Sequence, residues 1–517
     1  MKGADHVVVV GAGLAGLSAA LHLLGAGRRV TIVERDGHPG GRAGRLDLRT
    51  ERGIYRADTG PTVLTMPELL GEAFAAVGER MEDRLDLVRL DPAYRATFAD
   101  GSTIDVHTDC EAMAEEVRRT CGPAAALGYL RLREWLTKLY DAQIDSFIGA
   151  NFDSPFDVVG PDLVRLARLG GFGRLGRRVA GFLPDERLRR IFSFQSLYAG
   201  VPPARALAAY GVIAYMDTVG GVYFPRGGMR AVGAALADAA VAAGATIHYG
   251  RSVTGLERRG GTVHAVRHRG RSSGDGSGDG TERLACDAVV LTPDLPVVHR
   301  LLGRAPRRPV PLRWSPSAVV VHAGLRGSRP ELAHHTISFG AAWESTFREI
   351  IEDGRVMSDP SLLVTRPTAT DPTLAPPGSD LLFVLAPCPN TAAGELDWRR
   401  IGPAYRDELL GVLDARGMSG LAGDVEVAEV VTPFEWAAQG LGAGTPFSAA
   451  HTFTQTGPFR QRNAVRGLTN AVLAGCGTTP GVGIPPVLIS GRLAAQRLTG
   501  TVTTSPRRPD GRVPTGR

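Results

Sequence analysis

The chain has 517 residues, of which 43% are hydrophobic and 22% are charged, and its formal net charge at pH 7 is +6. These values are typical of a globular protein that is long enough for two or three hydrophobic cores. A net charge of this size does not require a polyanionic partner. The sequence also has no zinc-ligand spacing, RNA-binding aromatic motif or long basic tract, which excludes the common nucleic-acid-binding classes.

The N-terminal stretch predicts a strand, a helix and a second strand. Val7–Val10 is a run of four valines, typical of a strand that is buried on both faces in a parallel sheet. Glycines at G-x-G-x-x-G spacing follow, then the small apolar segment Leu14–Leu24 and a second apolar run, Val30–Val33, which ends on Glu34. A secretory signal or a membrane span is the competing interpretation, but the glycine-rich break and the second strand disfavour both.

Each glycine of this motif has a physical role. Gly11 permits the tight turn, Gly13 lets the backbone approach a pyrophosphate, and Gly16 lets the helix pack closely on the strand. The helix N-terminus offers N–H groups and a positive dipole to phosphates, and Glu34 lies where a carboxylate can accept hydrogen bonds from a ribose. The stretch therefore predicts a dinucleotide-binding unit, with NAD and FAD both open at this point.

Two further motifs favour FAD. The sequence GGR at residues 40–42 follows the acid closely, and a glycine pair can bring backbone N–H groups near a diphosphate. Together with DTGPT at residues 58–62, it resembles FAD-binding oxidoreductases of the amine-oxidase and carotenoid-desaturase type. This resemblance implies FAD as the cofactor.

The middle of the chain predicts further elements by its periodicity. Helices are expected at Pro67–Val77, Glu111–Arg119, Ala124–Ile148 and Ala231–Ala243, a hairpin at Leu85–Val106, and strands at Thr246–Tyr249 and Cys286–Thr292. The strand Thr246–Tyr249 is a candidate member of the dinucleotide sheet. The segment Val222–Met229 reads as a turn, and the low-complexity stretch Arg271–Gly280 predicts a flexible loop between hairpin strands.

From Pro293 to Val430, Pro-rich turns alternate with apolar strands such as Ala318–His322 and Leu381–Leu385. This alternation predicts a second domain that contains a sheet. The adjacent histidines His334 and His335 have no third ligand at metal-like spacing, so we expect no metal site.

The segment Asp162–Arg190 interleaves apolar side chains with eight arginines. Such a pattern is typical of a helix at a membrane interface, where arginines reach anionic headgroups. A solvated helix pair packed on the domain explains the pattern equally well.

The five cysteines are widely spaced, without a C-x-x-C pair. Their odd number and spacing favour a reducing cytoplasm and give no redox dithiol. Cys476 is the only one inside a motif, and a packed small side chain is the preferred interpretation over a flavin-linked thiol.

The C-terminal part extends the resemblance over nearly the whole chain. Thr445–Asn463 and Leu473–Leu493 (LAGCGTTPGVGIPPVLISGRL) resemble bacterial phytoene desaturases, as do FSFQSL at residues 192–197 and YFPRGGM at 223–229. Around the start of this second block an apolar strand, Ala471–Ala474, runs into a glycine-rich loop, and a helix is expected from Pro486 onward. In this family the segment lies against the flavin ring.

The resemblance implies an α/β fold in which a Rossmann-type FAD-binding domain is interleaved with a mixed α+β substrate domain. The expected parts are the FAD-binding domain at 1–90, 222–298 and 461–500, a helical substrate and membrane-associating region at 91–221, a substrate domain with a sheet at 299–460, and a disordered tail at 501–517. The candidate cofactor-binding residues are Gly11, Ala12, Gly13, Gly16, Glu34, Arg35, Gly40, Gly41, Arg42, Gly60, Pro61, Thr62, Val253, Gly475, Gly483, Ile484 and Pro485.

The implied activity is FAD-dependent desaturation of phytoene, stepwise toward neurosporene or lycopene, with quinone or oxygen as electron acceptor. The alternatives are a flavoenzyme for another carotenoid (a C30 precursor, a hydroxy or methoxy carotenoid, or a carotenoid isomerase), a non-catalytic flavin- or carotenoid-binding protein, and a nicotinamide dehydrogenase. Asp185 and Arg189, one helical turn apart, resemble a polar pair of the family's substrate pocket, and an ordinary surface pair is the competing interpretation.

The expected substrate has consequences for location. A C40 hydrocarbon has on the order of 1,000 Å² of surface, worth roughly 25 kcal/mol on leaving water, so it does not travel through water. We therefore expect a cytoplasmic protein attached peripherally to the inner face of the cell membrane, with Asp162–Arg190 as the candidate patch.

Overall fold

The predicted N-terminal strand–helix–strand unit lies at the centre of a five-stranded parallel sheet. The computed structural model describes residues 5–270, 280–305 and 310–500. The strand order is β19-β13-β1-β2-β9, and every neighbouring pair is parallel. The strands are β1 (His6–Val10), β2 (Arg29–Val33), β9 (Thr246–His248), β13 (Ala288–Leu291) and β19 (Ala471–Leu473). All five strands lie in apolar runs that the sequence predicts as strands. The run Thr246–Tyr249 is therefore confirmed as a member of the dinucleotide sheet.

The four valines of β1 are buried alternately in two different cores. Val7 and Val9 pack in the core that contains helices α1 (Leu14–Gly25), α9 (Arg230–Ala242) and α15 (Ile484–Thr499). Val8 and Val10 pack in the core formed with the antiparallel sheet β10 (Arg251–Arg259), β11 (Thr262–Gly270) and β12 (Thr281–Ala285). The strand is buried on both faces because helices cover one side of the sheet and a second sheet covers the other.

A seven-stranded mixed sheet contains the strands predicted between residues 293 and 430, and it also takes in two strands from residues 94–106, inside the part predicted as helical. Its order is β18-β14-β17-β16-β15-β6-β7, antiparallel except between β15 and β6. The strands are β6 (Tyr94–Thr97), β7 (Thr103–Val106), β14 (Ser317–Arg326), β15 (His335–Ser338), β16 (Leu362–Thr365), β17 (Ser379–Cys388) and β18 (Val425–Val431). Helix α12 (Trp398–Ala415) covers one face, packing on Val319, Val321 and Ala323.

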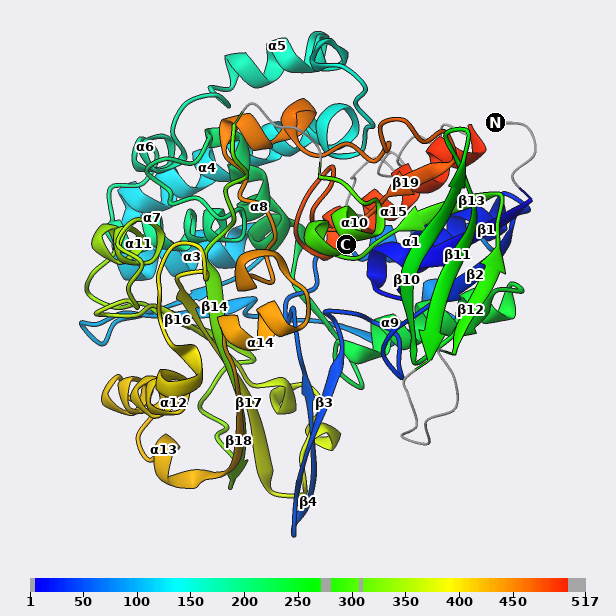
Figure 1. The fold of residues 1–517 in the computed structure, drawn as a ribbon. Coiled ribbons are helices and arrows are strands. Elements are labelled where there is room, and N and C mark those ends of the chain that lie inside the picture. Colours follow the sequence, from blue (N-terminus) through cyan, green and yellow to red (C-terminus); the bar gives the residue numbers. More distant parts are fainter. Residues whose placement is uncertain (1–4, 271–279, 306–309, 501–517) are drawn as a thin grey trace.

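The opposite face of this sheet turns toward the hairpin of β3 (Arg45–Thr50) and β4 (Gly53–Asp58). A Cβ added to Gly324 would lie 2.8 Å from the ring of Tyr55, which shows how closely this hairpin approaches the sheet. Figure 1 shows the parallel sheet and α1 on one side of the molecule and the seven-stranded sheet with α12 on the other.

A helical region lies beside both sheets (Figure 1). It contains α3 (Cys110–Cys121), α4 (Pro123–Asp141), α5 (Pro161–Arg168), α6 (Leu175–Ala180), α7 (Glu186–Ile191), α8 (Gly211–Tyr215) and the π-helical turn η6 (Met216–Gly220). The helix expected at Ala124–Ile148 is α4 up to Asp141, followed by the π-helical turn η2 (Ile144–Ile148), and Asp162–Arg190 forms three short helices. No helix within the described residues is long and apolar enough to cross a membrane.

Three details differ from the sequence-based expectations or fall outside the structure. Val222–Met229 is not only a turn, because Tyr223–Pro225 forms strand β8, which pairs with β5 (Leu87–Arg89). Helix α15 begins at Ile484 rather than Pro486, since proline is tolerated in a first helical turn, whose N–H groups have no intrahelical partner. Residues 271–279 of the predicted loop and the predicted tail 501–517 lie outside the described residues.

Candidate active site

The glycine-rich turn between β1 and α1 forms the floor of the candidate cofactor site. Gly11 has φ +104°, and its N–H donates to Val33 O at 2.9 Å. A Cβ on Gly16 would lie 2.1 Å from Gly11 O, so glycine is required there for the helix to reach the turn. The roles predicted for these two glycines are therefore met by the geometry of the protein itself.

Gly13 is different, because neither backbone strain nor packing requires glycine at this position. Its φ and ψ are −72° and 169°, an extended conformation open to any residue, and an added Cβ would meet only Gly41 Cα, at 3.8 Å. Gly13 is the N-cap of α1, and among the described residues no side chain caps this end of the helix. Open space and free N–H groups at a helix N-terminus fit a pyrophosphate.

Glu34, at the end of β2, is buried beside this turn. Its carboxylate accepts hydrogen bonds from Ala12 N at 2.6 Å and from Asp36 N at 2.8 Å. Burial raises the pKa of this carboxyl, and the two backbone donors oppose that shift. The start of β10 lies alongside, since Arg251 N donates to Glu34 O at 2.8 Å, which brings Val253 to the same edge of the sheet.

Residues 40–42 lie directly against the glycine-rich turn. Gly40 N donates to Ala12 O at 2.9 Å, and a Cβ on Gly41 would lie 3.0 Å from Gly13 Cα. The half-buried guanidinium of Arg42 lies 3.4 Å from the buried carboxylate of Asp294. Arg35, by contrast, points outward and donates to Gln439 O at 2.6 Å.

The segment at residues 58–62 completes this side of the site. A Cβ on Gly60 would lie 2.0 Å from Arg42 O, so the segment packs on the backbone of the GGR motif, and Pro61 follows directly. Thr62 is buried, and its hydroxyl accepts a hydrogen bond from the Thr365 hydroxyl at 3.1 Å. The site thus joins the five-stranded sheet to the seven-stranded sheet.

The C-terminal loop reaches the same region from the other side. Gly475 has φ +118° and donates its N–H to Ser490 Oγ at 3.0 Å. A Cβ added to Gly475 would lie 4.0 Å from Ala15 Cβ, so this loop approaches the start of α1. Gly483, with φ +114°, is the N-cap of α15, and Ile484 and Pro485 begin this helix. Their placement against a flavin remains a prediction.

The predicted pair Asp185 and Arg189 is not an ion pair in the structure. Helix α7 begins at Glu186, so Asp185 is its N-cap and accepts from Arg187 N at 2.8 Å, while its carboxylate pairs with the Arg187 guanidinium at 2.8 Å. Arg189 donates instead to Leu183 O and Pro184 O, both at 2.8 Å. A role for either residue in the substrate pocket remains a prediction.

Sequence reasoning missed a small cavity between the segment at 58–62 and the seven-stranded sheet. Its lining is mostly apolar, with a few polar groups, and consists of Ala57, Asp58, Thr62, Phe224, His322, Thr365, Pro367, Leu381, Leu382 and Phe383. His322 is fully buried, and neither ring nitrogen has a hydrogen-bond partner among the described residues. A histidine at the end of the apolar run Ala318–His322 was the available signal.

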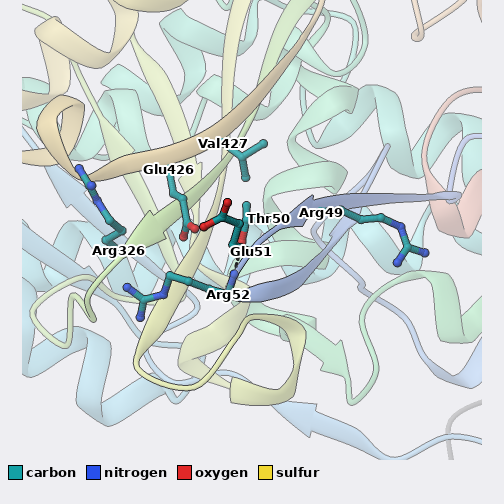
Figure 2. Close-up of a pocket in the computed structure, with 7 residues that line it drawn as sticks. All are labelled: Arg49, Thr50, Glu51, Arg52, Arg326, Glu426 and Val427. Atoms are coloured by element: carbon teal, nitrogen blue, oxygen red, sulfur yellow. Dashed lines mark hydrogen bonds between the residues drawn. The ribbon is translucent and has the colours of Figure 1, made fainter.

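A second, open depression lies at the tip of the β3–β4 hairpin and is lined by charged side chains (Figure 2). In this view Glu51 and Glu426 lie near one another, while Arg49 points away from them. The mixed charge offers no apolar wall to a hydrocarbon, which excludes this depression as the substrate site.

Comparison with known proteins fits this arrangement. The profile of the family described as "Flavin containing amine oxidoreductase" matches residues 14–499. Among solved structures, an oxidoreductase from Methanosarcina mazei (TM-score 0.61, 16% identity, 94% of this chain and 98% of that chain) and cyclohexylamine oxidase from Brevibacterium oxydans (TM-score 0.56, 16% identity, 96% and 99%) share the fold.

Relatives of known sequence are more similar. A phytoene dehydrogenase from Streptomyces griseus is 65% identical over 98% of both chains, and a zeta-carotene-forming phytoene desaturase from Myxococcus xanthus is 36% identical over 95% of this chain and 93% of that protein. A lycopene-forming phytoene desaturase from Paracoccus is 32% identical over 97% and 99%. These matches confirm the α/β flavoprotein fold and FAD as the cofactor, and the chain belongs to the flavin-containing amine oxidoreductase family, among its phytoene desaturases.

Proposed function

We propose that this protein desaturates phytoene, with bound FAD as hydride acceptor. The observation that carries the proposal is the 65% identity with a phytoene dehydrogenase over 98% of both chains. The N-terminus of α1 at Gly13, which no described side chain caps and where packing does not require glycine, supports it.

The chemistry requires a hydride acceptor, which FAD supplies when bound. Hydride loss from a C–H bond beside a double bond leaves an allylic cation on the substrate, and proton loss from the neighbouring carbon completes the new double bond. The chain must therefore position the substrate and exclude water rather than supply a nucleophile.

The residues that would hold FAD follow from the site. The N–H groups around Gly13 would bind the pyrophosphate, and Glu34 the ribose. Gly40 and Gly41, which have positive φ and pack on the backbone of Ala43 and Gly13, would present the GGR motif to the diphosphate, and Thr62 would lie beside the ring.

The experiment for the substrate compares three classes of compound. Purified protein with FAD is supplied with phytoene, a C30 precursor or a hydroxylated carotenoid in liposomes, with quinone or oxygen as acceptor, and the products are separated by chromatography. Desaturation of phytoene supports the proposal and counts the steps toward neurosporene or lycopene. Conversion of only the C30 or hydroxylated compound would overturn the substrate assignment.

We also propose that the protein docks peripherally on the inner face of the cell membrane through an apolar surface around α5. The exposed side chains come from two separate segments, Phe156, Val159 and Val164 from the first, and Phe453 and Phe459 from the second. Turn η11 (Gly457–Phe459) packs against η3 (Pro155–Val158), so the two segments form one surface. Phe156 and Phe453 are 80% and 59% exposed.

This surface, which we name the α5 surface, shares only the α5 part of the predicted patch Asp162–Arg190, and its other apolar side chains lie outside that stretch. The C-terminal part of that stretch is packed inward, since Leu188, Arg190 and Ile191 are buried and Arg190 donates to Gly340 O at 2.7 Å. Arg165 and Arg168 remain exposed on α5, where they would meet anionic headgroups. Figure 1 shows α5 at the end of the molecule away from α12.

The membrane proposal is tested by flotation with anionic liposomes. Phe156→Ser together with Phe453→Ser is expected to reduce liposome binding, because each removes apolar area that enters the interface. Phe434→Ser is the matched control, since Phe434 is also exposed, at 42%, but lies on α14 (Pro433–Ala438). Equal binding by both variants would overturn the assignment of the α5 surface.

A further inference from the structure

Four side chains form a row across four neighbouring strands of the seven-stranded sheet. In the strand register, His322 of β14 is opposite Phe383 of β17, Phe383 is opposite Thr365 of β16, and Thr365 is opposite His335 of β15. Residues directly opposite in antiparallel strands lie on the same face of a sheet. Since His322, Phe383 and Thr365 line the cavity with Thr62, the row faces the segment at residues 58–62.

One hydrogen bond joins two members of this row, and a second connects the row to that segment. His335 Nδ1 lies 2.9 Å from Thr365 Oγ1, and the Thr365 hydroxyl donates to Thr62 Oγ1 at 3.1 Å. All three side chains are buried, with exposed fractions of 0%, 0% and 5% in that order. The chain of contacts runs from the interior of the sheet to the candidate cofactor site.

The direction of these hydrogen bonds follows from counting hydrogens. A threonine hydroxyl has a single hydrogen, and that of Thr365 is used toward Thr62. Thr365 therefore accepts from His335, which must carry its hydrogen on Nδ1. Burial lowers the pKa of His335 to about 3, so the ring is neutral and has no second hydrogen for Nε2. Nε2 is therefore an acceptor in this tautomer, and no donor to it is found among the described residues.

The hydroxyl hydrogen of Thr62, which ends this series of hydrogen bonds, has no acceptor among the described residues. Thr62 Oγ1 accepts from Thr365, and no hydrogen bond donated by its own hydroxyl is found within the described residues. A buried donor without an acceptor costs about 1–3 kcal/mol, so a group from outside the protein is expected to accept it. His322 in the same cavity has the same need, since both of its nitrogens are without partners there.

The polyene expected as substrate has no polar atom, whereas a flavin ring carries carbonyl oxygens and ring nitrogens. We propose that His335, Thr365 and Thr62 form a directed relay of hydrogen-bond donors, and that Thr62 donates to the flavin of bound FAD. The relay rests on the proposed function for the presence of FAD. A donor to the ring stabilises the reduced, more electron-rich flavin, so the relay raises its readiness to accept hydride.

Thr62 is the donor to the cofactor, and Thr365 and His335 are positioning residues that act through it. The test uses the full-length holoenzyme without phytoene. Thr62→Val keeps the shape and removes the donor, and Thr62→Ser keeps the donor. The readouts are the flavin absorbance spectrum and the anaerobic reduction equilibrium against a reference dye.

Thr62→Val is expected to shift this equilibrium about ten-fold toward oxidised flavin, equivalent to about 30 mV for a two-electron couple, and to change the flavin absorbance bands. Thr62→Ser is expected to match the wild type. Thr365→Val is expected to shift the equilibrium in the same direction, by less.

The neighbouring histidine offers a matched control. His334 Nδ1 lies 2.6 Å from Thr370 Oγ1, the same kind of contact, but no hydrogen bond joins Thr370 to Thr62 among the described residues. Thr370→Val should therefore leave spectrum and equilibrium unchanged.

An unchanged equilibrium and spectrum in Thr62→Val, in a preparation whose wild type binds FAD and desaturates phytoene, would overturn the relay alone. An equal shift in Thr370→Val would overturn it as well. A shift in Thr62→Val in a protein that binds FAD but does not convert phytoene would support the relay while the substrate proposal fails. A wild type that binds no FAD would overturn both.

Discussion

Replacement of Gly13 by alanine separates ligand binding from folding more cleanly than any other change in the glycine motif. In the folded chain the new Cβ would meet only Gly41 Cα, at 3.8 Å, and the backbone already has φ −72° and ψ 169°. At such a compatible site, Gly→Ala stabilises a protein by about 0.4–1 kcal/mol through the unfolded state. We therefore expect Gly13→Ala to fold as stably as the wild type or slightly more so.

Binding of FAD should respond in the opposite way. The methyl group would occupy the space through which a pyrophosphate reaches the N-terminus of α1, and overpacking of this kind costs about 1–3 kcal/mol. The expected loss of FAD affinity is about five- to 150-fold. The assay is titration of the apoprotein with FAD by flavin fluorescence, together with the urea midpoint of the same apoprotein.

Gly16→Ala is the contrasting variant. Its Cβ would lie 2.1 Å from Gly11 O, so it should lower the urea midpoint of the apoprotein itself. The reasoning is refuted if Gly13→Ala binds FAD as tightly as the wild type, or if it loses stability as Gly16→Ala does.

Two further predictions concern stability. Burial raises the pKa of Asp217 from 3.8 to about 7, so between these pH values the folded state holds a proton that the unfolded state releases, and wild-type stability falls as pH rises. Asp217→Asn has no such proton. Its stability relative to wild type, measured by urea unfolding, should therefore increase by up to about 4 kcal/mol from pH 4 to pH 7 and then stay level. A stability difference that does not change with pH would contradict this. Gly491→Ala would place a Cβ 2.4 Å from Ala15 O at the contact of α15 with α1, so it should lower the free energy of unfolding by about 1–3 kcal/mol. Gly411→Ala in α12, where an added Cβ meets nothing within 4 Å, should leave it unchanged or raise it. Equal melting temperatures for these two glycine variants would refute the close contact.

The elements around the cofactor site could be predicted because they depend on local signals. The valine run, the glycine spacing and Glu34 lie within thirty or so residues of one another, and each carries its own physical reason. The strand at residues 246–248 was also predictable, since a short apolar run after a helix is typical of the next strand of a parallel sheet.

The relay and the cavity could not be predicted, because they depend on strand register. Thr62 and Thr365 are 303 residues apart, and a shift of one residue in any strand would move His322 or His335 to the other face. From the sequence, His335 was considered as a metal ligand and that role was rejected; adjacent histidines carry no information about the strand opposite. Asp185 and Arg189 do not pair in the structure. Helix α7 begins at Glu186, so Asp185 is its N-cap, and its carboxylate pairs with Arg187 instead.

The central claim is that this chain passes hydride from phytoene to its own bound FAD. It is tested most directly by anaerobic mixing of the FAD-loaded protein with phytoene in liposomes, without quinone or oxygen. The account predicts loss of flavin absorbance at the same rate as a longer polyene chromophore appears, in equal amounts. Flavin that stays oxidised while bound, with no change in the carotenoid spectrum, would contradict it.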